Sequence, residues 1–157
     1  AALSPDAEVI VVQDNPSGMG YRESKNTTAY ALSAEAVGFP YEFEGITGAA
    51  MFSPDGRYLL LNADGYLVYT ADDWSDSSTW QQIGVIESNA RRIAFMPNDL
   101  LLIASDGELQ FWDIPTQTLL TSISDNYPDF FSLDVSADGR LIVATSRVSV
   151  RAFGIPE

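Results

Sequence analysis

Residues 52–69 read FSPDGRYLLLNADGYLVY, a stretch with two turn signals, each followed by an apolar run. Pro, Asp and Gly favour turns because they fix or permit the backbone angles that a chain reversal needs. The run YLLL at 58–61 shows no polar alternation, which is typical of a strand covered on both faces. The stretch therefore predicts a hairpin whose first strand lies inside a layered structure.

The same pattern occurs four times along the 157 residues. The four copies are LSPDAEVIVVQDN (3–15), FSPDGRYLLLNADG (52–65), FMPNDLLLIASDG (95–107) and VSADGRLIVATSRV (135–148). Their aligned positions, Pro5, Pro54, Pro97 and Ala137, are 49, 43 and 40 residues apart, a period at which repeat folds are found. Further strand-like runs follow each copy, so each repeat is expected to hold four short strands. The predicted repeats are 1–44, 45–86, 87–124 and 125–157.

The third repeat carries a family signature in ASDGELQFWDIPTQTLLTSI, residues 104–123. Its Asp-Gly turn, its Trp112–Asp113 pair and the Thr-rich turn that follows resemble a WD40-type β-propeller; propellers of the TolB kind, with SPDG turns, are similar too. The other repeats depart from the Trp-Asp pair, with Tyr30–Ala31, Thr70–Ala71 and Phe153–Gly154 in its place. The chain has no His, so the Gly-His pair of WD40 repeats is missing.

This resemblance implies an all-β fold, a β-propeller with about four four-stranded antiparallel blades in one region over 1–157. The first repeat holds little of its first strand and the last lacks an outer strand, so we expect an open arc of a seven- or eight-bladed ring. Bare blade faces would expose more apolar surface than solvent tolerates. The predicted covering is the rest of a longer polypeptide, with a second copy or a different protein as alternatives. Leu60 and Leu102 are expected to face neighbouring blades.

Charge and composition limit the classes of partner and of reaction that the chain could have. The net charge is −14, from 8 basic and 22 acidic side chains, which disfavours nucleic acid and anionic membranes as partners. Without His or Cys, an enzyme would need a carboxylate pair or a carboxylate-bound metal. Asp14, Asp64 and Asp106 recur at equivalent turns, which indicates a turn role rather than catalysis. We therefore predict no enzyme activity and no cofactor.

The candidate contact residues lie in the connections, because loops on a rigid scaffold carry recognition. The 14–26 loop and the 87–92 loop hold most of the cations, and aromatic residues occur in the 71–79 and 125–130 loops. The predicted partner-binding residues are Arg22, Lys25, Arg91, Arg92, Tyr127 and Trp74. For each the alternative is a structural role: charge neutralisation, packing over a blade edge, or a tolerated insertion.

A calcium site is a weaker possibility in the 71–79 loop, where Asp72, Asp73 and Asp76 supply oxygen ligands. The spacing lacks the glycine and the bidentate Glu of an EF-hand. The competing interpretation is that these side chains cap a turn while Trp74 folds back onto the blade.

The sequence thus favours a non-catalytic protein–protein interaction scaffold. The alternatives are a self-assembling subunit completed by other copies, that is a homo-oligomer, and, less favoured, a propeller enzyme or calcium-binding module.

Overall fold

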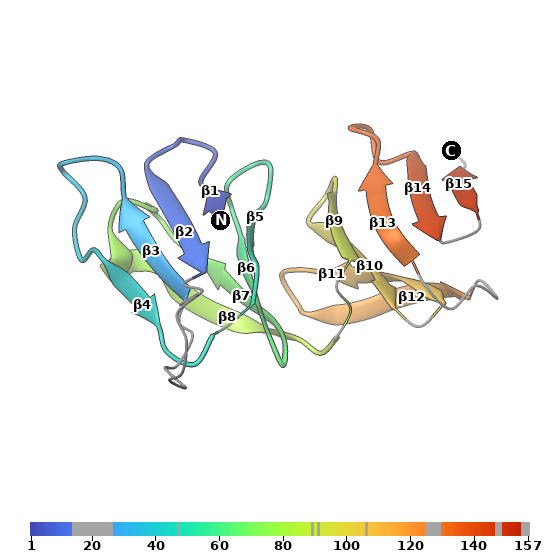
Figure 1. The fold of residues 1–157 in the computed structure, drawn as a ribbon, viewed down its shortest axis with the longest axis horizontal. Coiled ribbons are helices and arrows are strands. Elements are labelled where there is room, and N and C mark those ends of the chain that lie inside the picture. Colours follow the sequence, from blue (N-terminus) through green and yellow to red (C-terminus); the bar gives the residue numbers. More distant parts are fainter. Residues whose placement is uncertain are drawn as a thin grey trace, which may run out of the picture. The chain divides into compact units, whose positions relative to one another are not determined.

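The computed structural model describes residues 1–13, 27–46, 48–88, 90, 92–105, 107–124, 130–146 and 149–154. Within these ranges the chain is all-β, with fifteen strands and a single short 3₁₀ helix, η1 (Ser77–Thr79) (Figure 1). No helix in the described residues is long and apolar enough to cross a membrane. The chain forms two compact units, Ala1–Val85 and Ile86–Glu157, called here the N-terminal and C-terminal units.

The N-terminal unit holds two antiparallel sheets of four strands, each with its strands in chain order. Sheet 1 consists of β1 (Ala2–Leu3), β2 (Val9–Gln13), β3 (Thr27–Ala31) and β4 (Tyr41–Phe43). Sheet 2 consists of β5 (Ala50–Phe52), β6 (Leu59–Ala63), β7 (Gly65–Thr70) and β8 (Gln81–Ile86), whose last residue falls in the next unit. The hairpin predicted from residues 52–69 is present as β6 and β7, with Leu60 opposite Val68.

The C-terminal unit holds sheets 3 and 4. Sheet 3 consists of β9 (Arg92–Met96), β10 (Leu100–Ser105), β11 (Glu108–Asp113) and β12 (Thr118–Ser124). Sheet 4 consists of β13 (Phe130–Val135), β14 (Leu141–Ser146) and β15 (Val150–Gly154). Sheet 4 has three strands among the described residues, as expected for a repeat without its outer strand. The prediction of four antiparallel sheets is confirmed, one per repeat.

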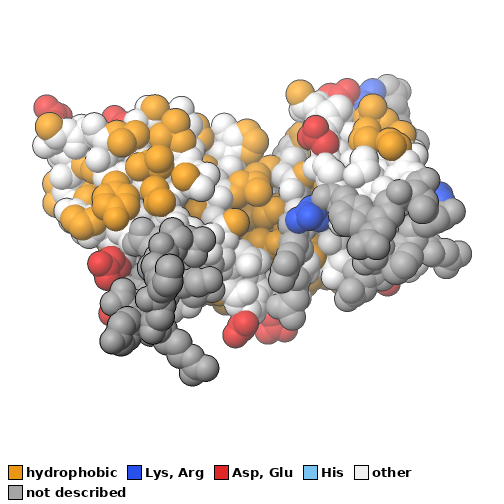
Figure 2. Space-filling model, in the orientation of Figure 1, with side chains coloured by type: hydrophobic (Ala, Val, Ile, Leu, Met, Phe, Trp, Pro, Cys, Tyr) orange, Lys and Arg blue, Asp and Glu red, His pale blue; other side chains and the backbone are white. Residues whose placement is uncertain are grey.

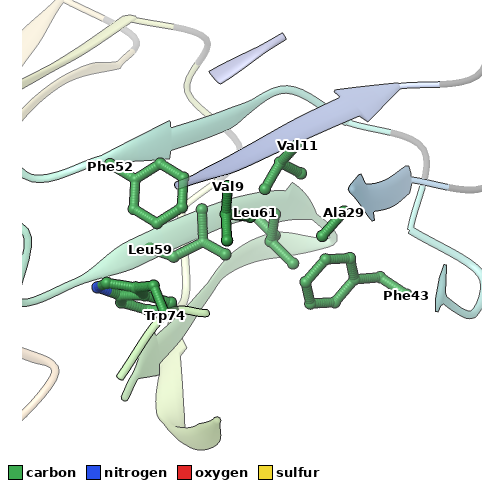
Figure 3. Packing of buried hydrophobic residues seen from close by; sticks show 8 residues of the cluster. All are labelled: Val9, Val11, Ala29, Phe43, Phe52, Leu59, Leu61 and Trp74. Atoms are coloured by element: carbon green, nitrogen blue, oxygen red, sulfur yellow. The ribbon is translucent and has the colours of Figure 1, made fainter. Parts of the chain in front are cut away.

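The second strand of each sheet carries the core. In β6 the consecutive residues Leu59, Leu60 and Leu61 are at most 1 % exposed, so both faces of the strand are buried. Leu59 and Leu61 lie on the face that meets sheet 1, where Val9 and Val11 oppose them (Figure 3). This confirms the two-sided burial that the unbroken apolar run predicted.

The C-terminal unit repeats this arrangement with a smaller set of side chains. Leu102 of β10 and Phe111 of β11 pack with Ile142 of β14, and partly buried residues such as Leu133 and Phe153 surround them. Leu102 therefore contacts the neighbouring sheet, as predicted. Leu60 is also buried, on the face of sheet 2 opposite to Leu61.

Candidate interaction surfaces

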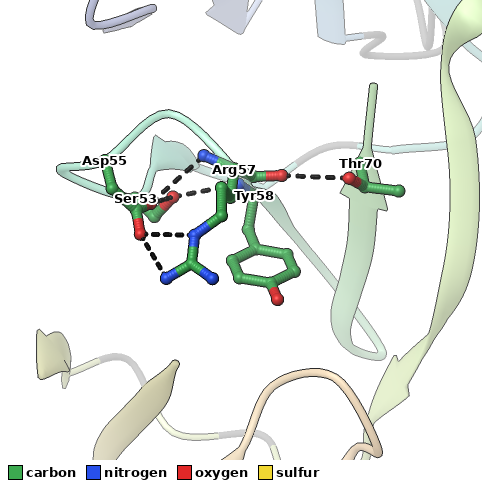
Figure 4. A network of polar contacts seen from close by, with 5 residues as sticks. All are labelled: Ser53, Asp55, Arg57, Tyr58 and Thr70. Carbon is green, nitrogen blue, oxygen red and sulfur yellow. Dashed lines mark hydrogen bonds and ion pairs between the residues drawn. The ribbon is translucent and has the colours of Figure 1, made fainter. Parts of the chain in front are cut away.

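The turns before the second strands are held by one repeated hydrogen-bond network. In sheet 2 the Ser53 hydroxyl donates to Asp55 Oδ1 at 2.7 Å, and the Arg57 N–H donates to the same oxygen at 3.1 Å (Figure 4). The Tyr58 N–H donates to Ser53 Oγ at 2.9 Å, which joins the turn to the following strand. The same bonds recur in sheets 1 and 4, where the serine and aspartate are Ser4 and Asp6, and Ser136 and Asp138.

These bonds also set the charge state of the turn carboxylates. Burial acts to raise the pKa of Asp55, but hydrogen bonds from Ser53 and Arg57 and the charge of the Arg57 guanidinium hold the pKa below its ordinary value. The guanidinium lies 2.7 Å from Asp55 Oδ2. At Asp138 the hydrogen bond from the Ser136 hydroxyl is the main cause of a lowered pKa. These carboxylates are structural acceptors at neutral pH, as expected for groups that stabilise turns.

The turns of adjacent sheets also meet. The fourth turn residue is in the left-handed region, with φ of 61° at Ala7, 75° at Gly56 and 72° at Gly139. A Cβ built on Gly56 would lie 3.5 Å from Pro5 Cγ, and one on Gly139 would lie 2.8 Å from Pro97 Cδ. In both units, therefore, the proline of one turn packs against the fourth residue of the next turn.

The 71–80 loop between β7 and β8 joins the two sheets of the N-terminal unit. Its Asp76 forms a parallel bridge with Val37, which follows β3. The Val37 N–H donates to the Ser75 carbonyl at 2.9 Å, and the Ser77 N–H donates to the Val37 carbonyl at 3.1 Å. The Ser77 hydroxyl bonds the Gly38 carbonyl at 3.0 Å. The loop was expected to be an insertion with contact residues. In the structure its bonds to Val37 and Gly38 hold sheet 2 to sheet 1, and we call the loop a clamp for this reason.

Trp74 is the clearest correction to the predicted contact residues. Its indole is only 6 % exposed and packs edge-on against Phe52, while its Nε1–H donates to the Gly56 carbonyl. Trp80 lies beside it, 5.4 Å between ring centroids, and stacks on Phe43 at 5.8 Å. A side chain buried in this way offers a partner almost no surface, so the alternative interpretation, an indole folded back onto the sheet, describes its position.

The aspartates of the same loop accept hydrogen bonds from its serines. Asp73 Oδ1 accepts from the N–H and hydroxyl of Ser75, and Asp76 Oδ1 accepts in the same way from Ser78. The bond from the Ser75 hydroxyl is the main cause of a lowered pKa at Asp73. No group of three His, Cys, Asp or Glu side chains in the described ranges is placed to hold a metal ion. Asp73 and Asp76 therefore cap this loop, as the competing interpretation expected, and a cation site at Asp72, Asp73 and Asp76 stays a prediction.

The remaining predicted contact residues divide into two groups. Arg92 begins β9 and is half-buried. Four others lie outside the described residues: Arg22, Lys25, Arg91 and Tyr127.

Strand β12 is a surface that the sequence reasoning did not select. It forms one edge of sheet 3, and all seven of its residues are exposed. Leu119, Leu120 and Ile123 are 46 %, 56 % and 43 % exposed. The sequence signal was present, because TLLTSI at 118–123 places apolar residues in the outermost strand of a blade, where sheet packing does not require them.

The comparisons with known proteins agree with this architecture. No family model matches the chain, and no curated protein matches its sequence. Among solved structures, the β-propeller domain of Cps50 (Swd1) from Myceliophteria thermophila matches 99 % of this chain with a TM-score of 0.65 and 15 % identity. A functionally unknown protein from Desulfotomaculum acetoxidans DSM 771 matches 98 % of it with a TM-score of 0.65 and 17 % identity.

The chain has a β-propeller fold. The likeness extends over nearly all of the chain but only 51 % and 50 % of the two solved chains, so this chain spans about half their length. The resemblance drawn from the SPDG turns and the Trp112–Asp113 pair is thus confirmed at the level of the fold. At such low identity the likeness shows architecture alone.

Proposed function

We propose that this propeller chain is a non-catalytic scaffold that binds another protein along strand β12. The observation that carries the proposal is the exposure of this strand through all seven residues, with Leu119, Leu120 and Ile123 accessible to a partner. An edge strand also presents unpaired backbone N–H and C=O groups, to which an extended segment can add. Rigid antiparallel pairing with β11 holds this edge in place.

The titratable side chains support a binding role. The aspartates with lowered pKa values, Asp55, Asp73 and Asp138, accept hydrogen bonds within their own turns. Acidic groups engaged in this way stabilise loops and do not form the unlike pair that general acid–base catalysis uses. The net charge of −14 favours a partner segment with basic residues beside its apolar ones.

The test compares affinity capture by the native chain with capture by Leu120→Glu, a change on an exposed side chain that leaves the core untouched. The matched control is Thr121→Glu, which adds the same charge one residue further along β12 but removes no large apolar group. Proteins captured by the native chain and the control, but lost at least about tenfold from Leu120→Glu, would support the scaffold role, since interface anchors carry most of the binding energy. Identical captured sets for all three chains would overturn it.

A further inference from the structure

Inside each unit the packing pairs one face of each sheet with its neighbour and leaves the other face outside that pairing, which gives four such faces in the chain. Two of the four, on sheets 1 and 4, carry exposed apolar side chains. We call the face of each sheet that carries the residues equivalent in register to Val9 and Val11 its leading face, and the opposite face its trailing face. In the N-terminal unit, Val9 and Val11 on the leading face of sheet 1 meet Leu59 and Leu61 on the trailing face of sheet 2. In the C-terminal unit, the leading face of sheet 3 meets the trailing face of sheet 4 around Ile142.

The trailing face of sheet 1 is apolar, and among the described residues no other sheet of its unit packs on it. Ile10 and Val12 stand at the positions that Leu59 and Leu61 occupy in sheet 2, as the register with the preceding strand shows. Leu59 and Leu61 are fully buried, whereas Ile10 and Val12 are only half-buried. Around them Leu3, Tyr30 and Leu32 are 51 %, 41 % and 56 % exposed. Figure 2 shows hydrophobic side chains gathered over β2 and β3 of this unit.

The leading face of sheet 4 also carries apolar side chains that are not fully buried. Leu141 and Val143 stand at the positions of Val9 and Val11 in sheet 1, both of which are fully buried. Leu141 is nevertheless 45 % exposed, and Val143 lines a hollow in this face together with Asp134. Apolar residues are thus retained at positions whose equivalents elsewhere pack against another sheet.

We propose that these two faces join two copies of the chain, the leading face of sheet 4 in one copy on the trailing face of sheet 1 in the other. This is the same kind of face pairing that each unit already contains. Two such junctions give a closed two-fold assembly of eight sheets. The chain covers about half of each solved propeller chain it resembles, so two copies supply the length of one. The proposal does not involve β12 and goes beyond the scaffold role.

The turn residues favour a second copy over an unrelated partner. Inside each unit, a turn proline packs against a glycine of the next sheet, as Pro97 does against Gly139, where an added Cβ would lie 2.8 Å from the ring. At the proposed junction the pair would be Ala137 from sheet 4 and Ala7 from sheet 1. Alanine lacks the proline Cγ and Cδ atoms, so the smaller residue at 137 leaves room for the larger residue at 7. The sheet 4 turn thus has a residue smaller than proline at 137, and the sheet 1 turn has a residue larger than glycine at 7, so the two differences compensate.

Negative charge is expected to weaken the proposed junction. Asp134 is exposed on the leading face of sheet 4, at the register position where sheets 1 and 3 carry Ala2 and Ala94. Each copy also carries a net charge of −14, so two copies repel one another. The structure therefore predicts that added salt and Asp134→Ala both tighten the dimer.

The first test is size-exclusion chromatography with light scattering from about 1 to 100 µM, the range that reveals a micromolar Kd. We expect the mass to rise from 17.1 kDa towards twice that value, and Ile10→Glu and Leu141→Glu to weaken association at least about tenfold. Leu120→Glu on β12 is the charge-matched control and should associate like the native chain. A native chain that stays monomeric, or that assembles beyond two copies, overturns the proposal.

Two further measurements address the head-to-tail geometry. Mixing Ile10→Glu with Leu141→Glu should give a heterodimer in which one of the two junctions has both native faces, so it should associate more tightly than either variant alone. No gain on mixing contradicts the pairing. Ala137→Pro alone should weaken the dimer, and Ala7→Gly in the same chain should restore it. The fold should tolerate Ala137→Pro, because the equivalent turn positions already hold Pro5 and Pro54. Circular dichroism checks that a weaker dimer does not result from misfolding. If Ala7→Gly changes the dimer Kd by the same factor with and without Ala137→Pro, the two residues act independently and the proposed contact is overturned.

Discussion

The two units hold their paired sheets together through different contacts. In the N-terminal unit the 71–80 loop bridges both sheets through Val37 and fills the space between them with Trp74 and Trp80. In the C-terminal unit the equivalent connection is the short turn of residues 114–117, in which Asp113 accepts from the Thr116 N–H at 2.9 Å. Among the described residues, the apolar cluster between its sheets consists of strand residues, and Pro97 and Gly139 make the turn contact beside it. The comparison teaches that the repeated strand pattern fixes each sheet, whereas the length of the connection decides whether loop residues also pack between neighbouring sheets.

The strongest test of this difference is removal of the clamp. Trp74→Ala should lower the free energy of unfolding by about 3–5 kcal/mol, because a buried indole leaves a large cavity. Trp112→Ala is the control in the C-terminal unit, where the half-buried indole bonds Gln110 of its own strand and the loss should be clearly smaller. Urea unfolding followed by circular dichroism measures both. Equal losses would mean that the 71–80 loop does not clamp the unit.

The C-terminal unit should depend on its aliphatic contacts. Leu102→Ala removes a fully buried side chain from the contact with sheet 4 and should cost about 2–5 kcal/mol. Leu120→Ala, on the exposed strand β12, should change stability by no more than about 0.5 kcal/mol. Urea midpoints for the two variants provide the measurement. A cost below about 1 kcal/mol for Leu102→Ala would contradict the sheet packing described here.

The turn contacts allow a finer comparison between the units. Gly56→Ala introduces left-handed strain alone, about 1–2 kcal/mol, because its Cβ would meet Pro5 at an ordinary distance. Gly139→Ala adds a clash with Pro97, so we expect a total cost of about 2–4 kcal/mol. Thermal unfolding of both variants measures the difference. If Gly56→Ala is the costlier change, the close approach of Pro97 to Gly139 is not present in solution.

The smallest expected effect concerns pH. A carboxylate whose folded pKa is lowered contributes stability above its unfolded pKa and loses that contribution as pH falls through the folded value. For Asp55 this places the loss below the ordinary value of 3.8. The group is largely exposed, so Asp55→Asn should remove no more than about 0.5 kcal/mol near neutral pH. Ser53→Ala should shift the Asp55 titration, followed by NMR, towards 3.8; an unchanged titration would contradict the role of the Ser53 hydroxyl.

Much of the fold could be predicted from local sequence. The SPDG segments predicted turns, which the structure contains, and their Ser and Asp side chains bond each other within them. The unbroken run at 58–61 likewise predicted burial on both faces of β6. These inferences succeeded because the interacting groups lie within a few residues of one another.

The candidate surfaces were harder to predict. Trp74 was predicted as a contact residue because it lies in a connecting loop, with an indole folded back onto the blade as the alternative. Its indole is buried among residues up to 65 positions away, at Val9. Composition gives no information on such long-range packing. Strand β12 was missed although its apolar run in an outer strand is visible in the sequence, because only the tertiary structure shows that the run is left exposed.

The sequence by itself determined the four sheets, the hairpin at 52–69 and the turns before the second strands, since each depends on hydrogen bonds between near neighbours in the chain. Only the tertiary structure decided which faces are covered, that the 71–80 loop clamps sheet 1 to sheet 2, and that Ile10 and Leu141 stay accessible. Those outcomes depend on which segments meet across long stretches of chain. Residues with the same local pattern, such as Ile10 and Leu59, therefore have different environments.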